Sequence, residues 1–393
     1  MKILILQDHL RSGGTERQSV LLAHAFTAAG HATTLASFRP GGALDGTVVP
    51  PVARHIFQPF DTGLNWFAPG LGGFVRRLQP EVILCMGRMA NCHVGRLQKL
   101  LPGTAVIATM RTGKKLPWLY RRSLRLARHI VANSHEAARG LAADHGIAAD
   151  KITVIHNALV FPPDAEALGG AATTPREVGE ARWGQPAPPD SEAPRPTFRA
   201  AHNATATTTV LLCVAMFRPE KNQRALVELA ARLPRDLDWQ LWLVGDGETR
   251  SECAALASKC GIADRMKFLG FQADPAPVYR AADVAVLTSR AESLPNFLIE
   301  AQAHGLPVVA EEVGGVRECF LPGETGWAVP PGDADAFLAA LAPLLGDPAR
   351  RAAAGRAART FARDAFAPAR QSQRYLDVFG RMVPTALPWR PKP

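Results

Sequence analysis

Short runs of apolar, often β-branched residues recur along the first 160 positions and alternate with longer amphipathic stretches. Such runs are typical of strands buried on both faces of a parallel sheet. They are KILILQ (2–7), ATTLAS (32–37), EVILCM (81–86), AVIATM (105–110), HIVANS (129–134) and ITVIHN (152–157). A helical pattern from Gln18 to Ala29 separates the first two runs and ends at Gly30, a residue suited to a helix C-cap. The alternation predicts an α/β fold with a doubly wound parallel sheet.

A second alternating series begins after residue 206 and predicts a second Rossmann-like unit. Its strand-like runs are TVLLCVAMF (209–217), WQLWLVG (239–245), MKFLG (266–270), DVAVLT (283–288) and PVVAE (307–311). Helical patterns cover residues 223–232 and 249–260, and another follows Pro295. The stretch from 333 to 379 is rich in Ala and Arg and is also predicted to be helical.

Residues 162–206 interrupt the alternation with a segment rich in Pro, Gly and Ala. A segment with so little apolar periodicity cannot bury enough surface to offset the entropy lost on ordering. We therefore expect a first domain at 1–161, a linker or disordered insertion at 162–206, and a second domain at 207–393. Two such units are expected to face one another across a cleft, because ligands of open α/β sheets bind outside the carboxyl ends of the strands.

Composition narrows the protein class only slightly. The 393 residues carry 45 Lys and Arg against 35 Asp and Glu, and the excess of cations lies in the first 160 residues. No apolar run reaches the roughly 18 residues of a membrane-spanning helix, and the N-terminus lacks the pattern of a signal peptide, so a cytoplasmic location is expected. The six cysteines include no Cys-x-x-Cys pair, so neither a zinc site nor a disulfide framework is expected. No nucleic-acid-binding motif accompanies the basic half.

Two loops that follow the first strand of each unit are candidate anion sites. Gly13 and Gly14 precede the first helix, where backbone N–H groups favour an anion and glycine permits its close approach. Arg218 and Lys221 follow the strand TVLLCVAMF and suit a diphosphate, since Arg binds it bidentately and Lys as a point charge. The alternatives are a tight turn at the glycines and a solvated basic turn at the cations.

A third candidate is a pair of carboxylates, Glu292 and Glu300, that flank the start of a helix at Pro295. The backbone N–H groups near this start can meet a phosphate, and both carboxylates can accept hydrogen bonds from sugar hydroxyls. The alternative is two solvated charges.

These segments together resemble family 4 of the glycosyltransferases over nearly the whole chain apart from the insertion. The motifs are EKN at 220–222, the two glutamates eight residues apart, and the run from GLPVVAEEVGG to GETGWAVPPGD, all in the family's order. GGTER and Ala132-Asn133-Ser134 match more weakly. The resemblance implies a GT-B fold and transfer of a sugar from a nucleotide donor with retention of anomeric configuration.

The resemblance also implies roles for individual residues. Glu300 would bind the ribose hydroxyls, Glu292 would contact the transferred sugar, and Lys221 would hold the diphosphate. Gly14 would allow the donor to approach the first domain. Leu294, Asn296 and Phe297 would place backbone groups near the phosphates. Gly270 and Phe271 would place backbone groups near the base.

Two positions depart from the family pattern. Ala215-Met216 stands where the family often has Gly-Arg, and Arg218 is a candidate replacement for the missing arginine. Arg111 follows Met110 where the family often places a histidine near the reacting sugar, and would supply positive charge there.

No metal or other cofactor is expected, because cations and a helix N-terminus can stabilise the departing diphosphate. Asp333 and Asp335 are interpreted as a helix cap rather than a metal pair. The open alternatives are a sugar-nucleotide epimerase or phosphorylase and a catalytically silent nucleotide-sugar-binding protein.

The segment from Arg111 to Arg128 mixes cations with apolar and aromatic residues. This composition predicts a peripheral contact with an anionic membrane, which would bring the enzyme to a lipid-linked or glycan acceptor of cell-surface polysaccharide synthesis. The alternative is a packed helix whose arginines face water.

Overall fold

The computed structural model describes residues 1–113, 116–159 and 195–383, which form two compact units. Of these residues, the first unit contains those up to 158 and those from 368 on, and the second contains residue 159 and residues 195–367. Among the described residues, no helix combines the length and apolar character needed to cross a membrane.

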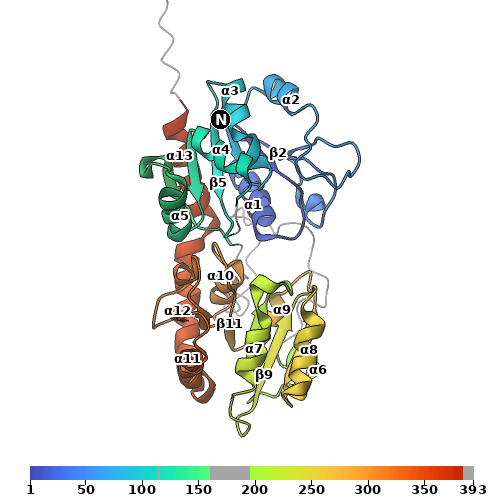
Figure 1. Ribbon diagram of the computed structural model, residues 1–393, viewed down its shortest axis with the longest axis vertical. Coiled ribbons are helices and arrows are strands. Elements are labelled where there is room, and N and C mark those ends of the chain that lie inside the picture. Colours follow the sequence, from blue (N-terminus) through green and yellow to red (C-terminus); the bar gives the residue numbers. More distant parts are fainter. Residues whose placement is uncertain (114–115, 160–194, 384–393) are drawn as a thin grey trace, which may run out of the picture. The chain divides into compact units, whose positions relative to one another are not determined.

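The first unit is built on a seven-stranded parallel sheet with the order β3-β2-β1-β4-β5-β6-β7 (Figure 1). In register, Ile3 of the central strand lies opposite Thr33 on one side and Val82 on the other. The strands are β1 (Lys2–Gln7), β2 (Ala32–Ser37), β3 (Ala53–Ile56), β4 (Val82–Cys85), β5 (Ala105–Met110), β6 (His129–Ala132) and β7 (Ile152–Val154). The order reverses between β1 and β4, which are neighbours in the sheet although β2 and β3 separate them in the chain.

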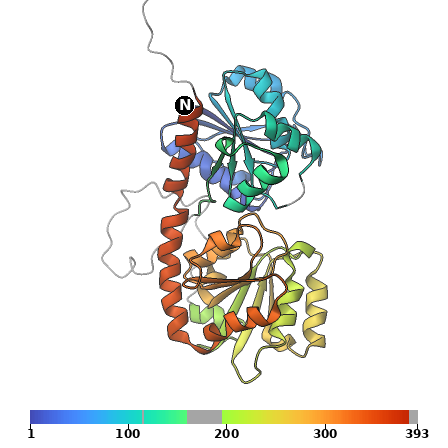
Figure 2. The same cartoon turned by 60° about the vertical axis from the view of Figure 1, so that its left-hand side comes forward.

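Helices cover this sheet, and one of them comes from the far end of the chain. They are α1 (Gly14–Ala28), α2 (Leu71–Leu78), α3 (Val94–Leu100), α4 (Trp118–Leu126), α5 (His135–His145) and α13 (Pro368–Met382). The red helix α13 packs against α1 (Figure 2), with Phe26 edge-on to Tyr375 and Phe379 at 6.2 and 5.4 Å between ring centroids. This placement differs from the predicted second domain at 207–393.

The second unit has a six-stranded parallel sheet with the order β10-β9-β8-β11-β12-β13 and helices on both faces (Figure 2). The strands are β8 (Thr209–Val214), β9 (Trp239–Val244), β10 (Met266–Gly270), β11 (Val284–Leu287), β12 (Val308–Glu311) and β13 (Gly326–Val329). The helices are α6 (Arg195–Ala201), α7 (Gln223–Ala230), α8 (Arg250–Lys259), α9 (Ala276–Ala281), α10 (Asn296–Ala303), α11 (Ala334–Gly346) and α12 (Pro348–Phe366). Here the order reverses between β8 and β11.

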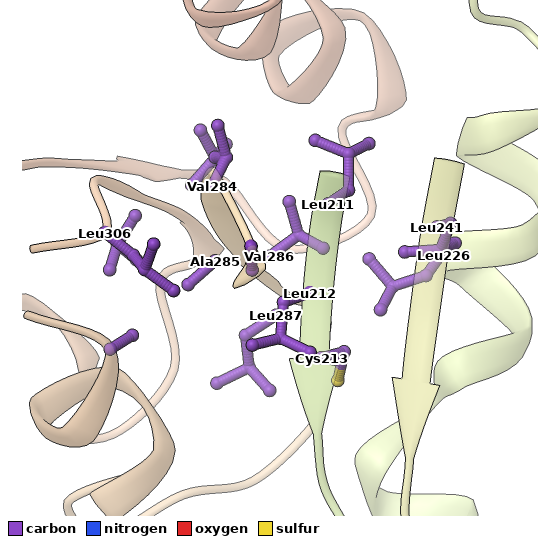
Figure 3. Close-up of a cluster of buried hydrophobic side chains, with 14 of the residues drawn as sticks. Leu211, Leu212, Cys213, Leu226, Leu241, Val284, Ala285, Val286, Leu287 and Leu306 are labelled. Carbon is purple, nitrogen blue, oxygen red and sulfur yellow. The ribbon is translucent and has the colours of Figure 1, made fainter. Parts of the chain in front are cut away.

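The core of the second unit forms where aliphatic side chains of β8 and β11 meet (Figure 3). Leu212 and Val284 are fully buried, and β11 pairs with β8 through Val284 and Leu211. Continuous apolar runs are required here because both faces of the strands are covered.

The predicted alternation of strands and helices is confirmed, with three local differences. Strand β3 was not predicted, because its sequence ARHI contains no apolar run. Strand β13 was also not predicted. Helix α6 lies within the predicted insertion, of which residues 162–194 fall outside the described part of the chain. Arg199 explains its order, because this buried side chain donates hydrogen bonds to the carbonyls of Thr205 and Ala281.

Candidate active site

The switch point between β8 and β11 brings two of the predicted catalytic residues into direct contact. Lys221 lies in the 3-10 turn η6 (Pro219–Lys221) after β8, and Glu292 lies in the loop after β11. Lys221 Nζ is 2.6 Å from Glu292 Oε1, and the Glu292 side chain is only 9% exposed. Because a buried carboxylate without a partner is costly, the lysine is the partner that compensates the burial of this side chain at the edge of the sheet.

Backbone contacts fix the two loops against each other. The Arg290 N–H donates to the carbonyl of Glu220 at 2.8 Å, and Thr288 Oγ1 donates to the carbonyl of Asn222 at 3.0 Å. Asn222 adopts a left-handed conformation with φ of 51°, which ends the turn and begins α7. The Lys221–Glu292 pair is therefore supported by the backbone on both sides.

Arg218 stands apart from this pair at the start of the same turn, with an exposed side chain. Met216, at the position where the family often has arginine, is 52% exposed. Both residues follow β8 at its carboxyl end, and both side chains are exposed to solvent there.

Helix α10 begins at Asn296, directly after Pro295 as the N-cap residue. Leu294 and Phe297 are buried and anchor the helix start, while Asn296 is half-buried. The N-terminus of α10, which has a partial positive charge, directly follows the loop that contains Glu292. Glu300 lies one turn further along α10, where Tyr279 Oη donates a hydrogen bond to its Oε2 atom at 2.6 Å.

A glycine pair after β12 supports the Glu292 loop, a role that no residue spacing predicted. Gly314 has φ of +55°, and a Cβ atom there would lie 1.9 Å from the carbonyl oxygen of Glu292. The Gly315 N–H donates to the carbonyl of Ser293 at 3.0 Å. The motif letters GG were visible in the sequence, but only the fold shows that they contact the loop of the first glutamate.

We expect Gly314→Ala to destabilise the second unit by about 2–4 kcal/mol, since it adds an overlap with the backbone to an unfavourable positive φ. Thermal unfolding measures this change. Gly323→Ala is the matched control, because Gly323 has φ of +79° with no atom within 4 Å of the added Cβ. An equal fall in melting temperature for both variants would contradict the close packing at Glu292.

The predicted base-side residues lie at the end of β10. Gly270 has φ of +66°, and its carbonyl accepts a hydrogen bond from the Gly245 N–H at 2.8 Å, while Phe271 is 62% exposed. A hollow of about 410 Å³ beside this edge is lined by Asp246, Gly247, Arg250, Ser251, Ala254 and Phe268. The exposed Phe271 ring offers an apolar surface for a flat ligand group.

The first unit has its own pocket at its switch point, between β1 and β4, with a volume of about 260 Å³. Gly13 is the N-cap of α1 and Gly14 its first residue, and Glu16 from the same helix lines the pocket. Arg111 also lines it and donates hydrogen bonds to Tyr375 Oη at 3.0 Å and to Asn157 Oδ1. The predicted positive charge of Arg111 is thus present in the pocket, held by the C-terminal helix.

Asp8 lines the same pocket and was not selected from the sequence. Its carboxylate accepts hydrogen bonds from the backbone N–H groups of Met89 at 2.9 Å and Ala90 at 2.7 Å. Burial raises the pKa of Asp8 to about 6, against the lowering effect of those two bonds. The one feature of the sequence that could have indicated Asp8 is its position as the first charged residue after a buried strand. Asp8 can therefore change its charge close to neutral pH.

The interpretation of Asp333 as a helix cap is confirmed. Asp333 Oδ1 accepts a hydrogen bond from the Ala336 N–H at 2.9 Å at the start of α11. Asp335 forms an ion pair with Arg232 instead of joining Asp333.

Two Rossmann-like units with candidate sites at their switch points define the GT-B class of protein. A family model described as "Glycosyl transferases group 1" matches residues 194–361, and one described as "Glycosyltransferase Family 4" matches residues 12–159. The chain belongs to family 4 of the glycosyltransferases.

Individual relatives agree with this assignment. The chain is 36% identical to "Lipopolysaccharide core biosynthesis glycosyltransferase LpsE" of Rhizobium meliloti (strain 1021), over 38% of this chain and 43% of that one. It is 34% identical to "D-inositol 3-phosphate glycosyltransferase" of Kineococcus radiotolerans, over 59% of this chain and 53% of that one. The chain thus spans about half the length of these relatives.

Solved structures show the same fold. Anabaena Alr3699/HepE in complex with UDP has a TM-score of 0.75 at 21% identity, covering 97% of this chain and all of that one. WaaG, a glycosyltransferase involved in lipopolysaccharide biosynthesis, has a TM-score of 0.68 at 17% identity, covering 96% and 99%.

Proposed function

We propose that this protein transfers a sugar from a nucleoside diphosphate donor to a glycan or lipid-linked acceptor, with retention of anomeric configuration. The observation that carries the proposal is the Lys221–Glu292 pair at the switch point, beside the N-terminus of α10. This edge combines a cation, oriented backbone and two carboxylates, which a phosphate flanked by sugar hydroxyls requires. The Anabaena relative has been solved with UDP and with UDP-glucose, and the names of LpsE and WaaG place them in lipopolysaccharide synthesis.

In the proposed reaction, the bond between the anomeric carbon and the diphosphate oxygen breaks while the acceptor hydroxyl attacks from the same face. The acceptor proton passes to the departing diphosphate, which leaves with the bonding electron pair. Lys221 and Arg218 stabilise the negative charge that grows on this diphosphate. Glu292 holds hydroxyls of the transferred sugar, and Glu300 holds those of the ribose.

The first experiment is a thermal-shift screen of UDP-, GDP- and ADP-sugars, because a ligand that binds the native state raises the melting temperature. The donor that binds is then incubated with a lipid and glycan extract, and proton NMR of the fresh product reads its anomeric configuration. Retained configuration and full activity in EDTA are expected. An inverted product contradicts the proposed reaction, a free epimer indicates an epimerase, and binding without turnover indicates a silent binding protein.

We further propose that helix α4 contacts an anionic membrane surface. Trp118, Leu119 and Leu126 are 64%, 46% and 42% exposed, and Arg122 lies over the Trp118 ring with 5.6 Å between guanidinium carbon and ring centroid. Arg121, Arg122 and Arg125 are exposed on the same helix. Exposed rings beside cations suit the interface of an anionic bilayer.

The structure reduces the set of residues predicted for this contact. Tyr120 and Leu124 are buried in the core, and Arg128 donates hydrogen bonds to the carbonyls of Pro102 and Met382. Arg111 is held in the first-unit pocket, and Lys114 and Lys115 lie outside the described residues. The proposed surface therefore consists of the exposed side of α4 alone.

Replacing Arg121, Arg122 and Arg125 together by Glu is expected to weaken binding to anionic vesicles by at least a hundredfold, at about 1 kcal/mol for each lost cation. Co-sedimentation with vesicles of phosphatidylglycerol or phosphatidylcholine measures the binding. The matched control reverses three exposed cations of the second unit, Arg235, Lys259 and Arg356. Equal recovery of wild-type protein with both lipids would exclude the membrane contact.

A further inference from the structure

Tyr279 on α9 is a buried tyrosine whose hydroxyl faces the carboxylate predicted to bind ribose. The residue is 1% exposed, and its Oη atom donates a hydrogen bond to Glu300 Oε2 at 2.6 Å. Hydrogen bonds to carboxylates are shorter and stronger than those between neutral groups. The bond joins two helices, because Glu300 lies on α10, so it fixes the glutamate relative to a neighbouring element.

The Tyr279 ring is itself held by aromatic neighbours from α10 and its C-terminal end. It stacks on His304 at 4.7 Å and 17° and on Phe297 at 6.2 Å and 27°. His304 Nδ1 lies 2.8 Å from the Glu300 carbonyl oxygen, and because a carbonyl can only accept, Nδ1 carries the proton. Burial lowers the pKa of His304 to about 4, so the imidazole is neutral at pH 7. The stack therefore contributes packing without charge and limits the movement of the phenol.

We propose that Tyr279 is a positioning residue, which orients the Glu300 carboxylate to receive the ribose hydroxyls of the nucleotide. The inference rests on the proposed function, because it explains how the same site would recognise the ribose. A glutamate side chain loses rotational freedom when it binds a ligand, and an existing hydrogen bond removes part of that cost beforehand. Tyr279 thus acts through Glu300 and does not itself touch the nucleotide.

The test compares a nucleotide that has ribose hydroxyls with one that lacks them. The probes are UDP, GDP and ADP, followed by the 2′,3′-dideoxy form of whichever diphosphate binds. Calorimetry should show that Tyr279→Phe raises the dissociation constant of the ribonucleotide up to about tenfold, because the Glu300 side chain must then be ordered when the nucleotide binds. The dissociation constant of the dideoxynucleotide should change less than twofold. A merely structural role would weaken both nucleotides alike.

Two further variants separate the possible results. His304→Phe keeps a ring stacked on Tyr279 and should preserve the preference for ribose. Tyr279→Phe combined with Glu300→Ala should be no weaker than Glu300→Ala alone, and this comparison remains valid if the single tyrosine variant unfolds at a lower temperature. An unchanged ribose preference in Tyr279→Phe overturns the inference, as does an equal loss for both nucleotides. If the inference is overturned but Glu300→Ala abolishes the preference for ribose, the proposed function stands. If the wild-type protein binds no diphosphate, the inference and the proposed function are both overturned.

Discussion

Lys221→Ala is expected to lower kcat by at least a hundredfold, which makes it one of the two most damaging single changes at the site. Removing one preorganised group that stabilises a developing anion costs about 3 kcal/mol in other enzymes. Here the change also leaves the Glu292 carboxylate, 9% exposed, without the cation 2.6 Å away. Steady-state kinetics with the donor found in the thermal-shift screen measures the effect.

Two comparisons give the Lys221 result its meaning. Lys259→Ala removes an exposed lysine from the same unit and should leave kcat unchanged. Arg218→Ala should resemble Lys221→Ala if Arg218 replaces the arginine that is absent at Met216. A silent Arg218→Ala beside an inactive Lys221→Ala would show that Lys221 alone supplies the charge. Wild-type kcat in Lys221→Ala would exclude its proposed role.

Alanine substitutions at the two glutamates are expected to impair different properties of the enzyme. Glu300→Ala should raise the dissociation constant of the nucleoside diphosphate by roughly 10- to 100-fold, because hydrogen bonds to a charged group contribute about 1.5–3 kcal/mol. Glu292→Ala should leave that constant within a few-fold and lower kcat by about a hundredfold, since its proposed contacts are to the transferred sugar. Calorimetry with the diphosphate and kinetics with the sugar nucleotide separate the two effects. Interchanged phenotypes would reverse the assignments, and wild-type behaviour in both variants would remove them.

The sequence predicted the strands whose composition follows from burial on both faces. KILILQ and AVIATM became β1 and β5 with the predicted bounds. Strand β3 was not predicted, because a strand with only one neighbour in the sheet needs no apolar run and ARHI has none. The edge strands β7 and β10 were predicted because their sequences, ITV and MKFLG, do contain apolar runs.

The candidate site was predictable in its parts but not in its contacts. Lys221 and Glu292 were each singled out from local patterns, yet 71 positions separate them. Their ion pair depends on the sheet order that places β11 beside β8, which no local pattern contains. Tyr279 and Asp8 were missed because a tyrosine in a helix and a charge after a strand have many ordinary roles. Only their distances to Glu300 and to the Met89 and Ala90 amides give them meaning.

Helix α13 has a consequence for the order in which the protein can fold during synthesis. Tyr375, Val378 and Phe379 belong to the same buried cluster as Ile3, Ile5 and Phe26, so the core of the first unit joins two segments that lie more than 300 positions apart. Residues 159–367 are translated between them, which takes roughly 10 to 40 s at usual rates of synthesis. The second unit, whose described residues all lie within that interval, can complete its core while the first still exposes the apolar side of α1. A ribosome-bound chain is thus expected to fold its later unit first, and premature termination before α13 would release a protein with a finished second unit and an open first one.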